Sequence, residues 1–292
     1  MADVRDVSTL QVRSTMAVVS EPTLCWVIRT NDGLLVEPVR EFVAELAANG
    51  TSPATRRSYC HDLLRWLRFC EAIDTTWDRA STEDVRDFVR WLRAAPNSQR
   101  VRSGKESRPP AGSVNAATGK TYLREGYSPR TINHALSVLS AFYTFMYETG
   151  RGPWSPVPAP QRRRDHLPTR RVRYRQKVPI FQPRSVTEAA LKDLFEVLRH
   201  DRDRALVAVA LSSGVRAGEL LSMTTRGVDA GQGVFAIEPK GGLGSRIWVP
   251  AAPESFVWIA RYLAQRPSVS GDGPLWLTPR PPHQPLNYFA LR

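Results

Sequence analysis

The sequence contains little cysteine and no long apolar run. Its three cysteines, Cys25, Cys60 and Cys70, are odd in number and form no C-x-x-C pair, so neither a disulfide framework nor a zinc knuckle is expected. No window of about 18 residues is apolar throughout, which argues against a transmembrane helix. The first residues lack the basic and apolar regions of a secretory signal. These absences predict a protein of the reducing cytoplasm.

Acidic residues are scarce relative to basic ones. The 292 residues include 28 Asp and Glu against 41 Lys and Arg, which gives a formal net charge of +13. Such an excess predicts a polyanionic partner. Nucleic acid is favoured over an anionic membrane surface, because the chain has no long basic amphipathic helix. The length suggests about two domains, and 42% hydrophobic residues exclude a disordered chain.

The chain from Glu37 onward has the apolar periodicity of helices. Apolar side chains recur at helical spacing after Glu37, Ser52, Ser81 and Ser128. The Ser-Pro pairs at Ser52 and Ser128 are typical of a helix start, because serine caps the first turn and proline suits the next position. Ser81 is followed three residues later by Asp84, as in a capping box. The pattern predicts a small domain of four helices.

Composition divides the chain into four segments. Residues 1–36 are weakly patterned: "STMAVVS" and "TLCWVIRT" are interpreted either as short extended segments or as an N-terminal arm, and no role is assigned to them. Residues 37–155 form the helical domain, in which residues 95–127, rich in Gly, Pro, Ser and basic side chains, are predicted to be a long exposed loop. Residues 156–184, rich in Pro and Arg, are predicted to be a basic linker to a second domain at 185–292.

The second domain combines helical and β-like patterns. Ser185 and Glu188 have the spacing of a capping box, and the helix after them is expected to bury an apolar stripe. The stripe consists of Leu191, Leu194, Phe195 and Leu198. The segment Ala205–Leu211 is apolar on nearly every side, which predicts a central helix. "GVFAIEP" and "SRIWVP", joined by "KGGLG", predict a β-hairpin, and "PESFVWIARYLAQ" predicts a further helix.

Arg216 and Lys240 are the candidate site residues. Arg216 follows the helix break at Gly214, and Lys240 stands where a strand meets a glycine-rich turn. A guanidinium can hold two oxygens of a phosphate, and a lysine at a flexible strand tip can give up a proton. Glu219 is placed to fix the guanidinium by a salt bridge. From spacing alone, a plain ion pair on a helix surface and a solvated turn lysine explain the same residues.

The stretch "LSSGVRAGELLSMTTRGVDAGQGVFAIEPKGGLGSRIWVPA" resembles the first catalytic box of the tyrosine recombinase, or phage integrase, family. Arg216 matches the first catalytic arginine of that family, Glu219 the acidic residue after it, and Lys240 the hairpin lysine. "SPATRRSYCHDLLRWLRFC" and "SPRTINHALSVLSAFYTFM" resemble its helical core-binding domain. The resemblance covers roughly residues 37–292. It implies a mainly α fold with a small β-hairpin or sheet: a SAM-like core-binding domain and an α+β integrase-type catalytic domain.

The resemblance also implies a chemistry. A tyrosine hydroxyl of such a recombinase attacks a DNA phosphate, forms a 3′-phosphotyrosyl link and releases a 5′-hydroxyl, so neither ATP nor a metal is needed. Two arginines stabilise the charged phosphate, and the lysine acts as general acid for the leaving oxygen. Protomers of the family assemble as tetramers on duplex DNA. A bacterial, phage or mobile-element origin and a cytoplasmic location are expected from the same likeness.

The sequence departs from the family pattern near its end. The second box, H-x-x-R, is not present among the 292 residues, because none of the five histidines has an arginine three residues later. Asn287 is predicted to cap a helix that begins at Tyr288, and in the family such a helix precedes the second box. Tyr288 therefore stands on the wrong side of that box to be the nucleophile. The catalytic domain is expected to be C-terminally incomplete, and this chain inactive alone.

Duplex DNA is the expected partner, and the basic residues at two helix starts and in the linker are expected to contact its phosphates. These residues are Arg56, Arg57, Arg130, Arg162, Arg163, Arg164, Arg170 and Arg171. A solvated hinge is the other explanation of the linker's charge. Two other functions stay open: a non-catalytic DNA-binding remnant or regulator, and an all-α adaptor whose basic faces bind acidic proteins.

Overall fold

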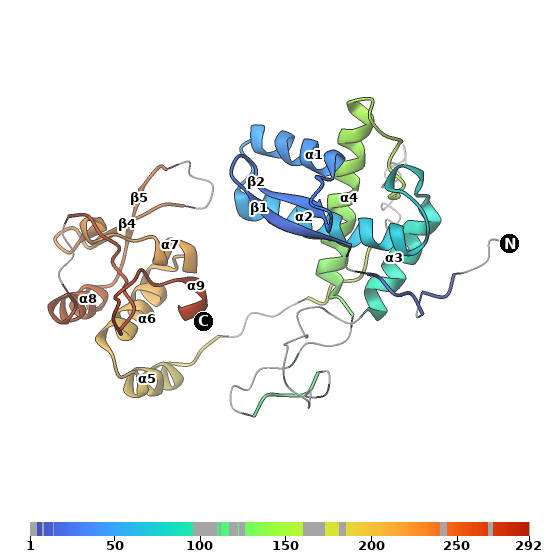
Figure 1. Cartoon of the computed structure of the whole chain (residues 1–292). Helices are drawn as coiled ribbons and strands as arrows, with labels where there is room; N and C mark the ends of the chain where they lie inside the picture. Colours follow the sequence, from blue (N-terminus) through green and yellow to red (C-terminus); the bar gives the residue numbers. More distant parts are fainter. Residues whose placement is uncertain are drawn as a thin grey trace, which may run out of the picture. The chain divides into compact units, whose positions relative to one another are not determined.

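The computed structural model describes residues 5–7, 9–13, 15–95, 110, 112–116, 122, 126–159, 173–180, 185–239, 244–267 and 271–291. The chain forms two compact units, Met1–Phe181 and Gln182–Arg292 (Figure 1). The division falls within the segment that composition marks as the linker. Each unit has its own hydrophobic core, and the two are described separately.

In its described residues the first unit is built on four helices, as predicted. They are α1 (Glu37–Ala48), α2 (Pro53–Ala72), α3 (Thr82–Ala94) and α4 (Pro129–Glu148), with a 3-10 turn at Trp77–Arg79. The Ser52 and Ser128 hydroxyls each accept a backbone N–H of the first turn at 3.2 Å, and Ser81 and Asp84 form the predicted reciprocal capping box. The local serine signals therefore fix where three of the four helices begin.

The two stretches interpreted as extended segments or an arm are strands, and they pair as a β-hairpin whose place in this unit the sequence did not predict. Strands β1 (Met16–Glu21) and β2 (Cys25–Thr30) pair antiparallel, and the hairpin lies along α2 (Figure 1). Val27 and Ile28 are buried in the core. The Arg68 guanidinium donates to the Met16 carbonyl at the open end of the hairpin. The segment without an assigned role is thus, from Met16 to Thr30, a packed layer of the helical unit.

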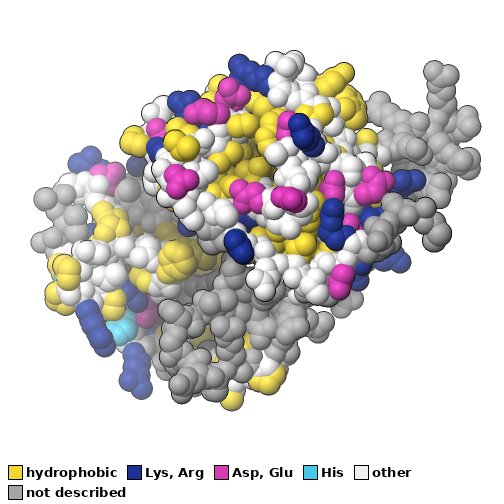
Figure 2. Space-filling model, turned by 45° about the vertical axis from the view of Figure 1, so that its right-hand side comes forward, with side chains coloured by type: hydrophobic (Ala, Val, Ile, Leu, Met, Phe, Trp, Pro, Cys, Tyr) yellow, Lys and Arg dark blue, Asp and Glu magenta, His cyan; other side chains and the backbone are white. Residues whose placement is uncertain are grey.

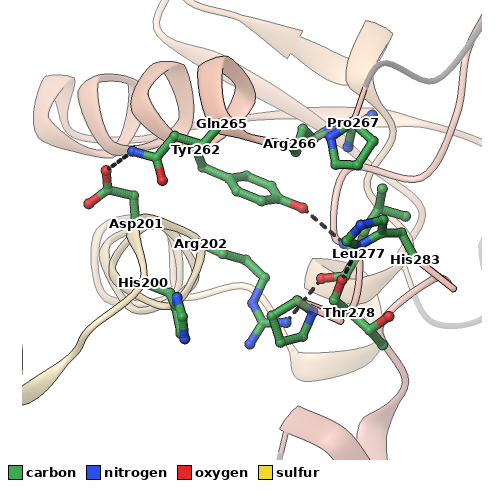
Figure 3. A pocket seen from close by; sticks show the side chains of 11 residues that line it. His200, Asp201, Arg202, Tyr262, Gln265, Arg266, Pro267, Leu277, Thr278 and His283 are labelled. Atoms are coloured by element: carbon green, nitrogen blue, oxygen red, sulfur yellow. Dashed lines mark hydrogen bonds between the residues drawn. The ribbon is translucent and has the colours of Figure 1, made fainter. Parts of the chain in front are cut away.

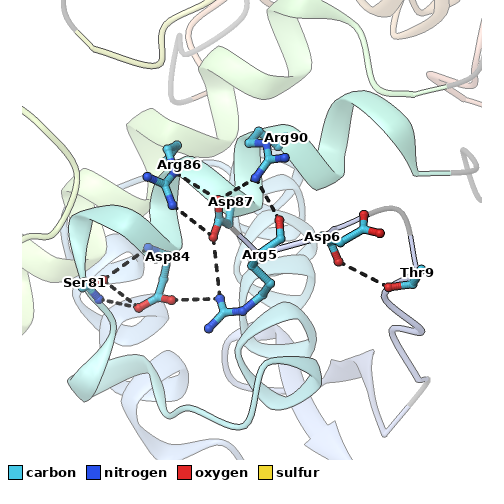
Figure 4. Close-up of polar contacts among 8 residues, drawn as sticks. All are labelled: Arg5, Asp6, Thr9, Ser81, Asp84, Arg86, Asp87 and Arg90. Atoms are coloured by element: carbon cyan, nitrogen blue, oxygen red, sulfur yellow. Dashed lines mark hydrogen bonds and ion pairs between the residues drawn. The ribbon is translucent and has the colours of Figure 1, made fainter. Parts of the chain in front are cut away.

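The residues before the hairpin are tied to α3 by charge (Figure 4). The Arg5 guanidinium lies 3.1 Å from an Asp84 carboxylate oxygen, and Arg90 donates to the Arg5 carbonyl at 2.9 Å. Asp87 is nearly fully buried and accepts from Arg86 and Arg90 at 3.1 and 3.2 Å. These contacts hold the described part of the N-terminal segment against the third helix.

Aromatic rings fill the middle of this unit. Trp66, Phe69 and Phe88 are fully buried and contact one another in edge and stacked arrangements. The Trp66 indole N–H donates to the Tyr143 hydroxyl at 3.1 Å, and that hydroxyl donates to the Trp77 carbonyl. Burial raises the pKa of Tyr143 far above its usual range, so the hydroxyl stays a neutral donor. The buried polar atoms of this cluster are therefore satisfied.

The second unit packs short helices around a small antiparallel sheet. Its helices are α5 (Glu188–Val197), α6 (Asp201–Ser213), α7 (Ala217–Leu221), α8 (Pro253–Gln265) and α9 (Tyr288–Leu291), with a 3-10 turn at Thr225–Gly227. Its strands are β3 (Val228–Asp229), β4 (Val234–Ile237) and β5 (Ile247–Pro250), in the order β3-β4-β5. The predicted hairpin is the β4-β5 pair. Asn287 caps α9 as predicted, because its side-chain oxygen accepts the Ala290 N–H at 3.0 Å.

Two expectations for the second unit are wrong. Helix α5 is capped by Thr187, whose hydroxyl accepts the Ala190 N–H at 3.3 Å, and not by a Ser185–Glu188 box. The stripe of Leu191, Leu194, Phe195 and Leu198 is not buried either: Leu194 is exposed and the others are half-buried. The hydroxyl nearest the first turn decides the cap. Helical periodicity predicts an apolar stripe, but the stripe is buried only where another element packs against it.

The centre of the second core also differs from the expectation. Helix α6 does bury Ala205, Leu206 and Val209, but Leu211 is 52% exposed. Leu275 and Trp276 are almost fully buried, and the Trp276 indole donates to the Leu220 carbonyl at 2.7 Å. The sequence around Leu275 and Trp276 has no helical or alternating apolar pattern. These two side chains are buried because they lie between α6, α7 and α8.

Candidate nucleic-acid interface and phosphate site

Arg216 stands where α6 ends and α7 begins. Gly214 adopts the left-handed conformation that ends α6 (φ +64°), and Arg216 is the N-cap residue of α7. The Glu219 carboxylate accepts both the Arg216 backbone N–H, at 2.8 Å, and its guanidinium Nη1, at 2.9 Å. One buried carboxylate thus fixes the backbone and the side chain of the same arginine.

Burial distinguishes this pair from an ordinary ion pair on a helix surface. The Glu219 side chain is 6% exposed, whereas the Arg216 side chain is 73% exposed. Because its partner is anchored inside the unit, the guanidinium is held at a fixed point while it faces solvent. Water screens the exposed charge, so the pair mainly orients the arginine and adds little stability. This arrangement suits a group that meets a solvent-borne anion such as a phosphate.

Lys240 lies outside the described residues. The strands on either side of it are described: β4 and β5 pair from Val234↔Pro250 to Ile237↔Ile247, so Lys240 belongs to the connection between them. Ile247 and Trp248 on β5 are half-exposed. The pairing of Arg216 with Lys240 at one phosphate stays a prediction.

The first unit presents two exposed arginines at its helix starts. Arg57 lies on the first turns of α2, with its guanidinium 4.6 Å from the Trp26 ring centroid, and Arg130 is the second residue of α4. Arg56 is different. Its side chain is buried, and it donates to the Thr51 carbonyl at 2.9 Å and toward the Cys25 sulfur at 3.5 Å. We therefore leave Arg56 out of the interface, because it already joins α2 to the hairpin.

The starts of α2 and α4 lie at the same end of the unit. The rings of Tyr59 and His134 are 5.8 Å apart, and further along both helices Trp66 is bonded to Tyr143. The two helices therefore run in the same direction. Their N-terminal N–H groups and the positive ends of their dipoles point the same way, which favours an anionic partner at this end.

Further basic groups follow Arg57 along α2. Residues Arg57, His61, Arg65 and Arg68 are spaced three or four apart, so they share one side of the helix. Burial and the positive charges of Arg65 and Arg57 lower the pKa of His61. We call these four residues, with Arg130 and His134 on α4, the basic edge. Sequence reasoning missed His61, Arg65, Arg68 and His134, although their spacing is visible in the sequence.

One buried carboxylate joins the two helices of the basic edge. Asp62 on α2 pairs with Arg65, and its other oxygen lies 2.6 Å from Nδ1 of His134 on α4. Burial raises the pKa of Asp62, although the charges of Arg65 and His134 oppose that shift. The Arg65 guanidinium also lies over the Tyr127 ring, 5.0 Å from its centroid. The edge is therefore braced from inside the unit.

The net charge is concentrated in one part of the chain. Residues 96–181 carry 16 Lys or Arg and only four Asp or Glu, so they account for nearly the whole excess of +13. On the face drawn in Figure 2, acidic side chains lie between the basic ones. The predicted linker contacts Arg162, Arg163, Arg164, Arg170 and Arg171 lie outside the described residues. The charge of this middle segment favours a polyanionic partner.

A cavity of about 130 Å³ lies at the other end of α6 from Arg216 (Figure 3). His200 and Arg202 line it from the start of α6, and Tyr262 from α8. Arg202 donates to the Leu277 carbonyl at 3.0 Å, and the Tyr262 hydroxyl accepts the Leu277 N–H at 3.0 Å. These bonds tie the segment around Leu277 to the helices, so we assign the cavity to packing and not to chemistry.

Among the residues that the structure describes, no group of three or more His, Cys, Asp or Glu side chains is placed to hold a metal ion. In the same residues no helix is both long and apolar enough to cross a bilayer.

Comparison with known proteins agrees with the resemblance seen in the sequence. Residues 39–103 match the model of the phage integrase N-terminal SAM-like domain. Tyrosine recombinase XerD of Xanthomonas axonopodis pv. citri is 30% identical over 161 residues, which cover 52% of this chain and 47% of the relative. Transposase A from transposon Tn554 of Staphylococcus aureus is 24% identical over 217 residues, which cover 70% and 55%. The chain spans about half the length of these curated relatives.

A solved structure shares the fold. The Tn1549 transposon integrase in complex with circular intermediate DNA superposes with a TM-score of 0.51 at 13% identity, over 83% of this chain and 71% of that one. At this identity the likeness concerns the fold alone. Taken with the domain match and the XerD and Tn554 relatives, and with the Arg216–Glu219 arrangement at the α6–α7 junction, it leads to one conclusion: the chain belongs to the tyrosine recombinase family.

Proposed function

We propose that the chain acts in site-specific DNA recombination, in which duplex DNA is cleaved and rejoined through a 3′-phosphotyrosyl link. The observation that carries the proposal is the Arg216 guanidinium, held toward solvent by a buried carboxylate at a helix junction. In this proposal Arg216 stabilises the negative charge of the reacting phosphate, and Glu219 positions it. Lys240 protonates the leaving 5′-oxygen.

DNA binding is assigned mainly to the first unit and the linker. Arg57 and Arg130 take phosphates at the starts of α2 and α4, and the linker arginines at 162–164, 170 and 171 follow the backbone of the duplex. Self-association on DNA belongs to the same proposal. The proposed location is the cytoplasm, and the proposed chemistry uses no cofactor.

We further propose that these 292 residues bind DNA without forming a covalent adduct. They contain no H-x-x-R motif, and Tyr288 precedes the place where that motif would stand. Tyr288 is half-exposed on the short helix α9. A site with one arginine and without its nucleophile has no covalent route, and loss of a single charge donor typically slows such chemistry about 10²–10³-fold.

A duplex-binding measurement and a denaturing gel test both parts. Binding to a 30-bp duplex should be strong and should weaken steeply with salt. The variant Arg162→Ala/Arg163→Ala/Arg164→Ala should lower the slope of log K against log salt by about 2–3, because each lost phosphate contact removes about one. A duplex nicked beside the scissile phosphate should yield no protease-sensitive band on the denaturing gel.

Each other result identifies a different error. A covalent band that is lost in Tyr288→Phe would make Tyr288 the nucleophile, and a band that persists would assign the reaction to another tyrosine. Absence of salt-sensitive duplex binding would favour an adaptor for acidic proteins and would overturn the recombinase proposal.

A further inference from the structure

The described part of the linker, residues 173–180, includes a short stretch that is docked on α4. The Asn133 side-chain amide donates to the Gln176 carbonyl at 3.0 Å, and its oxygen accepts the Gln176 backbone N–H at 2.7 Å. One side chain therefore satisfies both backbone groups of a single linker residue, as a neighbouring strand would. We call this pair of bonds the Asn133 clamp.

Further contacts hold the residues on either side of Gln176. The Arg175 guanidinium donates to the Ser137 hydroxyl at 2.8 Å, one turn beyond Asn133 on α4. Tyr174 packs against the core of the first unit and has a φ of +68°. A bulky residue keeps this unfavourable backbone conformation only where its surroundings hold it. The stretch from Arg173 to Lys177 is thus built into the first unit.

The exposure of these residues alternates. Tyr174 and Gln176 are half-buried and face the unit, while Arg173, Arg175 and Lys177 are exposed. The sequence "RYRQK" shows the same alternation of anchors and cations. Arg173 and Tyr174 form a turn, so the alternation is one of exposure and not of strand geometry. The docked stretch therefore leaves three cations exposed to solvent.

The clamp places these cations beside the proposed DNA contacts. Asn133 lies three residues after Arg130 on α4, and residues so spaced are neighbours on a helix surface. From residue 126 to residue 181 the sequence has only two acidic residues, Glu148 and Asp165. The positive charge of the stretch thus adds to that of Arg130 and of the α4 N-terminus.

We propose that residues 173–177 are a fixed part of the DNA-binding surface, and that Asn133 is the positioning residue that holds their cations against the phosphates of the duplex. This inference rests on the proposed function, because it names a further element of the same DNA interface. It differs from a plain hinge, in which the basic linker would touch DNA only as a mobile chain.

Three variants of the full chain separate these possibilities. Asn133→Ala removes the clamp and leaves every charge in place. Arg173→Ala/Arg175→Ala/Lys177→Ala removes the cations and leaves the clamp. Ser137→Ala is the matched control on the same helix face, because it removes one bond from Arg175 but neither bond of the clamp. Circular dichroism verifies that each variant keeps its helices.

Two readouts are needed, one without DNA and one with it. Without DNA, trypsin cleavage after Arg175 and Lys177 and exchange of the Gln176 amide proton should accelerate at least tenfold in Asn133→Ala, and less than twofold in Ser137→Ala. With a 30-bp duplex, Asn133→Ala should bind about 3- to 10-fold more weakly. The triple variant should bind more weakly still, with a salt slope lower by about 2–3.

The outcomes that would overturn the inference differ from those that would overturn the proposed function. Equal trypsin and exchange rates in Asn133→Ala and the unaltered chain would show that the clamp does not hold the linker. Faster cleavage with unchanged duplex affinity and salt slope would show a clamp without a role in binding. If the unaltered chain fails to bind the duplex, the proposed function is lost, and with it the role of the cations in binding DNA.

Discussion

The two units differ in the number of apolar residues that they bury. Among the described residues, the main cluster of the first unit contains 26 buried apolar residues, and that of the second contains 13. Both units also leave large apolar side chains exposed, such as Trp154 at 70% in the first and Phe289 at 86% in the second. The first unit therefore bears its functional groups on the larger core. In the second, Arg216 is held by a local arrangement at a helix junction.

The comparison also concerns how charge is held. In the first unit, buried carboxylates such as Asp62 and Asp87 brace arginines that lie on neighbouring turns or segments. In the second unit, the buried Asp201 braces α6 and α8 in the same way, because it pairs with Arg204 and accepts from Gln265. Glu219, in contrast, holds the exposed Arg216 within one turn. This local contact fixes a single group, which suits the binding of one phosphate.

The largest expected effect comes from the first core. Trp66→Ala should lower the free energy of unfolding of the first unit by about 3–5 kcal/mol, because it empties a large buried volume and leaves the Tyr143 hydroxyl without its donor. Urea unfolding followed by circular dichroism measures the change. Trp154→Ala is the control, since that side chain is 70% exposed and should change the value by less than about 0.5 kcal/mol. Similar midpoints for the two variants would contradict a self-sufficient first core.

In the second unit, substitutions of Glu219 and Arg216 should lower stability by smaller and unequal amounts. Glu219→Ala should cost about 1–2 kcal/mol of stability, because α7 loses the carboxylate that caps its first turn. Arg216→Ala should cost less than about 0.5 kcal/mol, because its guanidinium is mostly exposed. Thermal unfolding of both variants measures the difference. Equal losses would mean that Arg216 has a structural role, and the proposal of a phosphate-binding arginine would weaken.

The sequence predicts what depends on local chemistry. Ser52, Ser81 and Ser128 mark helix starts correctly because the capping hydroxyl and the backbone N–H that donates to it lie within four residues of each other. The same holds for Asn287 at α9. The Arg216–Glu219 contact was foreseen for this reason and from the family resemblance. These features need no knowledge of the tertiary fold.

What the sequence leaves out depends on contacts between distant segments. The β1-β2 hairpin is stabilised by α2, and Trp276 is buried because α6, α7 and α8 surround it. Arg56 looks like its neighbour Arg57 in the sequence, but the hairpin buries one and leaves the other exposed. The apolar stripe of α5 shows the reverse case, a clear local pattern without a covering surface. Position-by-position propensity contains none of this information.

The smallest predicted effect is a pH dependence at the joint between the N-terminal segment and α3. Burial works against it, but hydrogen bonds from Ser81 and Arg5 lower the pKa of Asp84 below its usual 3.8. A carboxyl whose pKa is lower in the folded state stabilises the fold above the unfolded value and loses that contribution as pH falls through the folded value. Asp84→Asn should therefore cost about 0.5–1 kcal/mol near pH 6 and progressively less below about pH 3.8.

Urea unfolding of Asp84→Asn and of the unaltered chain at several pH values between 6 and 3 measures this dependence. Arg40→Ala is the control, because its pair with Glu37 is exposed on both sides and should change stability little at any of these values. Asp62 provides a comparison of opposite sign. Because burial raises its pKa, the contribution of Asp62 to the stability of the fold is present at low pH and is lost as the pH rises. A cost in Asp84→Asn that stays constant down to pH 3 would show that the carboxylate charge does not hold the N-terminal segment on α3, and that the first unit is braced there by packing alone.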